Sequence, residues 1–169
     1  MGTRKVEKVA AIVIALSVTV LSVVHIGDWS SVGIYSSCPL SNRLIYPFFH
    51  AGFIHAVLNA WCLLSIVFIY DVSVWRMLFA YVAAVTMPVD TFGAFLSLDS
   101  PTVGLSGVVY VLLGSISFEV ARKRFFQLWM LFYIAVGFLF PNTNAWLHLY
   151  CYLCGFAFAL LNKPMEVKP

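Results

Sequence analysis

The stretch Gly104-Leu105-Ser106-Gly107-Val108-Val109-Tyr110-Val111-Leu112-Leu113-Gly114 decides how the chain folds. It begins an apolar helix, yet it carries a hydroxyl flanked by two glycines, which hydrophobic burial alone does not require. Gly104 and Gly107 let another backbone approach closely and leave the Ser106 hydroxyl uncrowded. Tyr110 follows four residues later and shares a helical face with Ser106. Gly114 continues that face, so the sequence predicts tight packing against a neighbouring helix.

The composition is that of an integral membrane protein. Of the 169 residues, 62% are hydrophobic and only 10% are charged, whereas soluble domains carry about 25% charged residues. A membrane-spanning helix needs roughly 20 apolar residues. The length therefore predicts one domain over residues 1–169, an all-α bundle of six transmembrane helices without a sizeable soluble part.

The hydrophobic runs place these six helices along the chain. We expect spans at about 9–26, 48–70, 74–92, 104–121, 125–140 and 145–161. Between the first two spans, residues 27–47 form the longest polar stretch. It contains Trp29, Tyr35 and Tyr46, and such aromatic residues are typical of the headgroup layer. We interpret this stretch as a loop at the outer membrane interface.

The basic residues predict the orientation of the bundle. Arg43 alone falls on the side of the long first loop. The other nine fall on the side of the termini: Arg4, Lys5, Lys8, Arg76, Arg122, Lys123, Arg124, Lys163 and Lys168. This asymmetry predicts that both termini are cytoplasmic. With no organelle presequence, it suggests a bacterial inner membrane. The net charge of +3 gives no support for a nucleic-acid partner, because the basic residues lie at the ends of spans.

Five polar residues fall at a similar depth, a little below the outer surface. His55 and Asn59 are four residues apart and share a helical face. His50 lies over one turn earlier, His148 is near the outer end of the sixth span, and Ser106 begins the fourth. Polar groups inside spans are costly and usually functional. The alternatives are separate buried polar groups bonded to backbone carbonyls, and a packing seam with an incidental serine.

These residue types together favour acyl-transfer chemistry. A serine hydroxyl is a poor nucleophile until a base removes its proton, and His148 is the candidate base. Donors for an oxyanion are available from Asn59, His55 and the backbone N–H of Ser106. Because no carboxylate lies at this depth with an obvious orienting role, we expect a Ser–His dyad rather than a triad. Tyr110 is expected to pack on the His148 ring.

The motifs resemble those of the rhomboid intramembrane serine proteases across essentially the whole chain. Gly104-Leu105-Ser106-Gly107 is similar to the family's G-x-S-G motif, followed by Tyr110 and Gly114. His50, His55 and Asn59 resemble its H-x4-H-x3-N pattern, and His148 with Gly155 resembles its last motif. The resemblance implies that Ser106 is the nucleophile and His148 the general base. It implies that His55, Asn59 and the Ser106 amide form the oxyanion hole, and that His50 supports the fold.

Three positions depart from that family's pattern. The first loop has Asn42-Arg43 where the family usually has Trp-Arg. Leu147 precedes the sixth-span histidine where alanine is common, and Cys151 replaces a glycine three residues after it. These departures bear on the rate more than on the reaction.

The resemblance implies an endopeptidase that cleaves single-span membrane proteins near the outer face of the bilayer. Its partners are then transmembrane substrates and the lipid bilayer, and no cofactor or metal is expected. One alternative is a non-catalytic relative that binds membrane clients. Another is a haem or metal protein that uses His50, His55 and His148. The C-x-x-C pair Cys151 and Cys154 lies in an apolar helix, where small core residues are the better interpretation.

Overall fold

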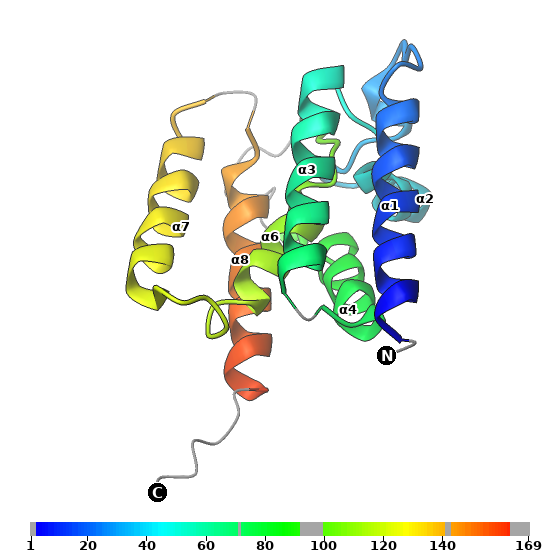
Figure 1. The fold of residues 1–169 in the computed structure, drawn as a ribbon. Helices are drawn as coiled ribbons and strands as arrows, with labels where there is room; N and C mark the ends of the chain where they lie inside the picture. The colour runs from blue at the N-terminus through cyan, green and yellow to red at the C-terminus, as the bar shows by residue number, and fades with distance from the viewer. Residues whose placement is uncertain (1–2, 71, 92–99, 141–142, 163–169) are drawn as a thin grey trace, which may run out of the picture.

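The structure is a computed structural model that describes residues 3–70, 72–91, 100–140 and 143–162. These residues are mainly helical. The elements, with η denoting a 3-10 turn, are α1 (Thr3–Leu21), η1 (Trp29–Ser31), α2 (Leu40–Ile45), η2 (Tyr46–Phe48), α3 (Phe53–Ile69), α4 (Val74–Val85), α6 (Ser106–Ser115), α7 (Lys123–Gly137) and α8 (Ala145–Leu161) (Figure 1). The only β pairing in this part of the chain is an isolated antiparallel bridge between Ile34 and Thr102. The predicted all-α class is therefore confirmed.

The contact between α6 and α8 forms the centre of the bundle. Two glycines, Gly114 of α6 and Gly155 of α8, lie directly against the backbone of the opposite helix. A Cβ added to Gly114 would lie 2.7 Å from the backbone nitrogen of Phe156, and one added to Gly155 would lie 2.9 Å from that of Ser115. Small residues are what such a close approach requires. The predicted small face beginning at Ser106 is thus the face that packs.

The other helices surround this pair unevenly. Helix α4 packs on α6, and α1 packs along α3 (Figure 1). Helix α7 stands at the edge of the bundle and contacts chiefly α8. The start of α1 and the end of α8 lie at the same end of the bundle, and α8 begins at the opposite end (Figure 1). Residues near the start of α8 are therefore far from the start of α1.

The segment between α1 and α3 is more structured than the interfacial loop that the sequence predicted. Helix α2 and η2 bend by 83° against α3. Tyr46 and Pro47 of η2 are buried, and the Ile34 bridge attaches the earlier part of the segment to Thr102. The segment therefore folds back onto the helices beside the start of α6.

The observed helices are mostly shorter than the predicted spans. Helix α8 has the predicted bounds, but α1 ends at Leu21, after which Val23 and Val24 donate hydrogen bonds three residues back. Helix α6 starts at Ser106 because Gly104 has a φ of +133°, outside the helical region. Helix α4 ends at Val85, close before a proline.

A length-and-hydropathy test of the described residues bears on the number of spans. No single helix is both long and apolar enough to cross a membrane alone, whereas the bent pair Leu40–Phe48 and Phe53–Ile69 meets the test together. The six-span count stays a prediction. Large apolar side chains nevertheless cover the outside of the bundle, such as Ile54, Trp61 and Leu131, which are 74%, 72% and 64% exposed.

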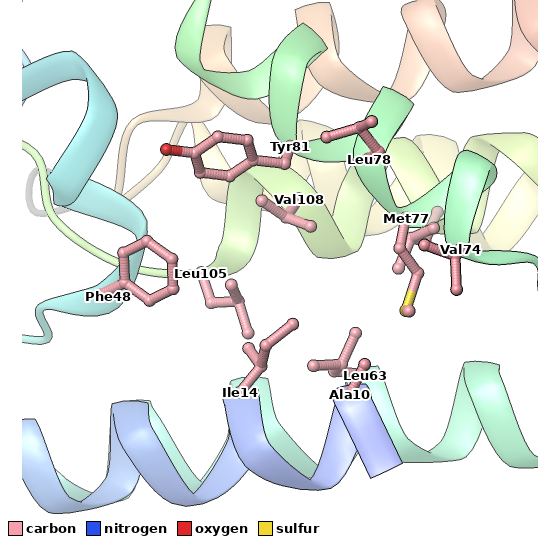
Figure 2. Close-up of a pocket in the computed structure, with 11 residues that line it drawn as sticks. Ala10, Ile14, Phe48, Leu63, Val74, Met77, Leu78, Tyr81, Leu105 and Val108 are labelled. Carbon is pink, nitrogen blue, oxygen red and sulfur yellow. The ribbon is translucent and has the colours of Figure 1, made fainter. Parts of the chain in front are cut away.

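An apolar cleft of about 290 Å³ lies between the α1–α3 pair and the α4–α6 pair (Figure 2). Ala10 and Ile14 line it from α1, Leu63 from α3, and Val74 and Tyr81 from α4. The surface that faces the cleft is apolar. The polar residues singled out by the sequence analysis therefore lie elsewhere in the bundle.

Candidate active site

Ser106 and His148 are 42 residues apart in sequence and meet across the α6–α8 contact. Ser106 is the first residue of α6, and His148 lies in the first turn of α8. The Nε2 atom of His148 lies 2.9 Å from the Oγ atom of Ser106. At this distance a hydroxyl can donate its hydrogen to a neutral imidazole. The two side chains that the sequence analysis paired are thus within proton-transfer distance.

Asn144 anchors the beginning of α8 beside the beginning of α6. Its Oδ1 accepts a hydrogen bond from the N–H of Leu147 at 2.9 Å, which caps the helix. Its Nδ2 donates to Thr102 Oγ1 at 3.1 Å. Thr102 belongs to the segment that leads into Ser106, so this contact helps to bring His148 opposite the serine.

Tyr110 stacks on the imidazole of His148. The ring centroids are 4.2 Å apart and the rings are inclined by only 11°. Tyr110 is one helical turn beyond Ser106, so the same face of α6 carries the hydroxyl and the aromatic platform. The stacking restricts rotation of the imidazole and favours the orientation in which Nε2 faces the serine.

Two hydrogen bonds hold the turn before Ser106. The N–H of Gly104 donates to the carbonyl oxygen of Tyr46 at 3.1 Å. The N–H of Leu105 donates to Nε2 of His50, also at 3.1 Å, and His50 is only 2% exposed. His50 therefore contacts the turn before Ser106 and not the Ser106 or His148 side chain, which is the place that a supporting residue would occupy.

His55 lies beside the turn, whereas Asn59 is engaged within its own helix. A Cβ on Gly104 would lie 3.0 Å from Cε1 of His55, so the glycine leaves room for that ring. The His50 and His55 rings meet edge to face with centroids 5.1 Å apart. Asn59 donates its Nδ2 to the carbonyl oxygen of His55 at 2.9 Å. An oxyanion role for Asn59 stays a prediction and would need its second amide hydrogen or a rotation.

A family comparison adds to this geometry. The Rhomboid domain model matches residues 39–164, well over half of the chain. The chain belongs to the rhomboid family. Rhomboid-family proteins are integral membrane proteins, in agreement with the apolar composition and the apolar outer surface of the bundle. No curated protein and no solved structure matches the chain.

Two of the three departures from the rhomboid pattern have local structural explanations. Asn42, which stands where the family usually has tryptophan, is 3% exposed and donates its Nδ2 to the carbonyl oxygens of Ser30 and Gly33, at 2.6 and 3.0 Å. Hydrogen bonds thus connect the two parts of the first loop. Cys151 is fully buried, and its Sγ would lie 3.4 Å from a Cβ on Gly107. The cysteine therefore fills the space beside the second glycine of the motif.

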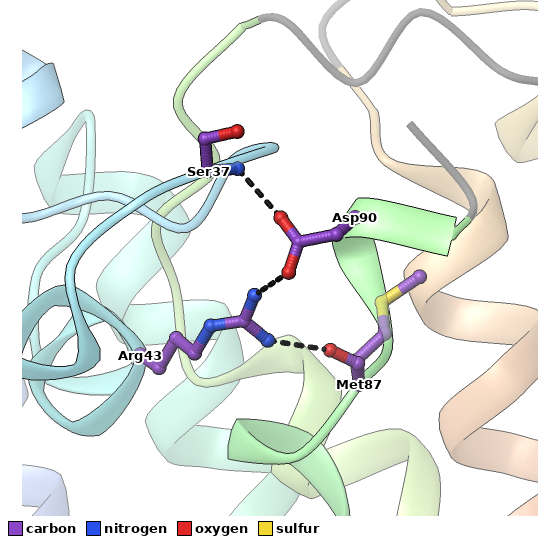
Figure 3. Close-up of polar contacts among 4 residues, drawn as sticks. All are labelled: Ser37, Arg43, Met87 and Asp90. Carbon is purple, nitrogen blue, oxygen red and sulfur yellow. Dashed lines mark hydrogen bonds and ion pairs between the residues drawn. The ribbon is translucent and has the colours of Figure 1, made fainter. Parts of the chain in front are cut away.

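The sequence analysis missed an ion pair on the first loop of this rhomboid (Figure 3). Arg43 donates to Asp90 Oδ2 at 2.6 Å and to the carbonyl oxygen of Met87 at 3.0 Å. The N–H of Ser37 donates to Asp90 Oδ1 at 2.6 Å. Two signals in the sequence were available: Arg43 is the only basic residue expected on the outer side, and Asp90 is a carboxylate expected near the same side.

The three histidines of the alternative haem or metal hypothesis contact other protein groups. His148 faces a serine, His50 accepts a backbone hydrogen bond, and the His55 ring packs edge to face against that of His50. Over the described ranges, no group of three or more His, Cys, Asp or Glu side chains is arranged to hold a metal ion. The four cysteines are free thiols.

Proposed function

We propose that this rhomboid-family protein is an intramembrane serine endopeptidase that uses a Ser106–His148 dyad. The observation that carries the proposal is the 2.9 Å separation of Ser106 Oγ and His148 Nε2. The hydroxyl lies at the start of a buried helix and the imidazole is stacked on an aromatic ring. Packing alone requires neither feature. Together they are the parts of a nucleophile and its base.

In the proposed reaction, His148 Nε2 takes the proton of Ser106 as Oγ attacks the carbonyl carbon of the scissile peptide bond. The tetrahedral intermediate collapses, and the imidazolium gives the proton to the leaving amine. The result is an acyl-enzyme, which a water molecule activated by the same imidazole then hydrolyses. Tyr110 keeps the imidazole oriented through both transfers.

The developing oxyanion would be stabilised near the first turn of α6. The N–H of Ser106 is at the start of that helix, where backbone amides have no intrahelical acceptor. The helix dipole also favours negative charge there. The ring N–H of His55, beside Gly104, is a second candidate donor, and Asn59 a third. A single donor of this kind contributes about 10²–10³ in rate.

The proposed substrates are membrane proteins with a single transmembrane helix. A helix hides its carbonyls in intrahelical hydrogen bonds, so a substrate must unwind locally before it reacts. The basic asymmetry predicts that both termini are cytoplasmic. The start of α8, with His148, lies at the opposite end of the bundle (Figure 1), so cleavage would take place toward the outer face. A bacterial inner membrane fits this orientation.

The decisive experiment removes each member of the dyad. Ser106→Ala, His148→Ala and the double variant should all lose cleavage of a single-span reporter substrate in reconstituted membranes. Because the two groups act as a unit, the three residual rates should be nearly equal. A fluorophosphonate should label the wild type but not Ser106→Ala. Thermal melting checks that each variant is folded.

The main alternative is a rhomboid-like protein that binds membrane clients without cleaving them. The intrahelical hydrogen bond of Asn59 favours this alternative, since it uses one donor of the expected oxyanion hole. Wild-type cleavage by Ser106→Ala, or no labelling of the native protein, would refute the protease. Retained co-purification of single-span clients with Ser106→Ala would then support the binding function.

A further inference from the structure

Each end of α4 is linked to another part of the bundle by an ion pair. Beyond its C-terminal end, Asp90 pairs with Arg43 at 2.6 Å. Near its N-terminal end, Arg76 pairs with Glu119 at 2.7 Å. The two arginine side chains are buried to a similar degree, at 17% and 18% exposure. The two pairs lie near opposite ends of α6. Glu119 follows the end of α6, whereas Arg43 belongs to the segment that contacts the beginning of α6.

The Arg43–Asp90 pair joins three stretches of backbone (Figure 3). Arg43 lies in α2 and also donates to the carbonyl oxygen of Met87, and Asp90 accepts the N–H of Ser37. Ser37 has a φ of +65°, in the left-handed region that residues other than glycine seldom adopt. Such a conformation persists where surrounding contacts hold it in place. The pair and its two backbone contacts, here named the clasp, thus fix the loop between α1 and α3.

A short path leads from the clasp to the nucleophile. Arg43 lies one turn before Tyr46, whose hydroxyl donates to the carbonyl oxygen of Ala84 at 3.0 Å. The carbonyl oxygen of Tyr46 accepts the N–H of Gly104, two residues before Ser106. Tyr46 is fully buried, so it cannot move without disturbing its neighbours. A shift of α2 would therefore be transmitted to the Gly104 turn.

We propose that Arg43 and Asp90 are positioning residues for the nucleophile: the clasp holds α2 and η2 where Tyr46 and His50 fix the Gly104–Leu105 turn before Ser106. This inference rests on the proposed protease function. It assigns to the exposed carboxylate of Asp90 an effect on the partly buried hydroxyl of Ser106. Neither residue of the clasp touches the dyad.

The proposal predicts a kinetic effect of a particular kind. Releasing the clasp lets the turn shift, and misplacement of a reacting group by about 1 Å can cost up to about 10² in rate. We expect Arg43→Gln and Asp90→Ala each to lower kcat about 10-fold, with KM little changed. The rate of fluorophosphonate labelling of Ser106 should fall by the same factor. The effects of the two single variants should be less than additive in the double variant, because both remove the same Arg43–Asp90 contact.

The ion pair at the other end of α4 supplies the matched control. Arg76→Gln and Glu119→Ala remove a pair of the same chemistry, whose arginine is buried to a similar degree, but beside the end of α6 and not its start. They should change thermal stability as much as the clasp variants while leaving kcat unchanged. Arg43→Lys should be intermediate, since lysine keeps the charge but lacks the fork that reaches both acceptors. An equal loss of kcat in both sets of variants would contradict the proposal, because it would show that the clasp has no specific effect on the position of Ser106.

Hydrogen exchange tests the same coupling without relying on cleavage. The amides of Gly104 and Leu105 should exchange faster in Arg43→Gln than in the wild type or Arg76→Gln. If the wild type labels and cleaves but the clasp variants match it in kcat, labelling and exchange, the clasp proposal is wrong and the protease function stands. If the wild type neither labels nor cleaves, the protease function and the role of the clasp in catalysis are both refuted. Faster exchange at Gly104 would then show only that the clasp holds the turn.

Discussion

Helices α6 and α7 pack against α8 in opposite ways. Helix α6 approaches so closely that Gly114 and Gly155 meet the opposite backbone. Helix α7 contacts α8 through a small cluster around Met130, Ile134 and Tyr152. The first contact brings Ser106 and His148 within hydrogen-bond distance and leaves no room for adjustment. The second leaves most of α7 outside the core, so the same helix α8 has one rigid and one loose partner.

The difference teaches where geometry matters in this protein. A dyad needs two atoms kept within hydrogen-bond distance, and glycine contacts between backbones resist deformation. A peripheral helix attached by few side chains can move at low cost. Substitutions at the α6–α8 contact should therefore be far more harmful than substitutions on α7.

The largest effect is expected for Gly155→Ala. A Cβ at this position would lie 2.8 Å from the carbonyl carbon of Val111 and 2.9 Å from the nitrogen of Ser115, so the helices must separate. Overpacking of this kind costs about 1–3 kcal/mol or more. Cleavage should be nearly abolished and the melting temperature lowered. Gly27→Ala, where no atom lies within 4 Å of the new Cβ, is the control and should behave as the wild type.

Cys151→Leu should have the next largest effect. The thiol is fully buried beside Gly107, so the longer side chain would push α8 from α6 close to the dyad. We expect a cost of about 1–3 kcal/mol and a clear loss of activity, whereas Cys151→Gly should be tolerated. Reporter cleavage and thermal melting measure both variants. Full activity of Cys151→Leu would show that this position does not set the α6–α8 distance.

Tyr152→Phe should weaken the loose contact without affecting the tight one. The Tyr152 hydroxyl donates to Gln127 Oε1 of α7 at 2.5 Å and lies 3.4 Å from Ser117 Oγ, two residues beyond the end of α6. Loss of the short bond to α7 should cost about 1 kcal/mol. Hydrogen exchange should increase in α7 but not in α6. The control is Tyr133→Phe on α7, whose side chain is 55% exposed and whose hydroxyl makes no hydrogen bond within the described ranges. Equal protection of α7 in both variants would contradict the assignment.

The smallest effect is expected for Leu128→Ala. This side chain is 66% exposed on α7, and substitutions at exposed positions usually change stability by less than about 0.5 kcal/mol. Melting temperature and cleavage should both stay near the wild-type values. A strong loss of either would mean that this face of α7 is covered by something in the membrane.

The sequence predicted more of the fold than of the contacts. Composition predicted a helical membrane protein, and the family match and the helices agree with it. The bounds of α8 were predicted because Asn144 precedes a long apolar run. The start of α6 was placed two residues early, because glycine is compatible with many conformations and only the fold shows that Gly104 has a φ of +133°. The helices within the first loop were missed because its polar residues resemble those of an ordinary loop.

For the candidate site, the sequence likewise predicted the residues better than their contacts. Residue types and spacing singled out Ser106, His148, His50 and Tyr110. The fact that His148 Nε2 reaches Ser106 Oγ depends on how α6 and α8 pack. Asn59 shows the limit: its spacing relative to His55 suggested a shared role, and the structure pairs its amide with the His55 carbonyl oxygen.

By itself the sequence determined which residues are apolar, which polar groups fall inside helices, and which of them share a helical face, because these depend on local periodicity and composition. Only the tertiary structure decided that α6 and α8 touch through glycines, that His50 holds the turn before Ser106, and that Arg43 pairs with Asp90, 47 residues away. The physical reason is that a hydrogen bond between distant residues depends on angstrom-scale distances and on direction. Those distances are set by the packing of whole helices.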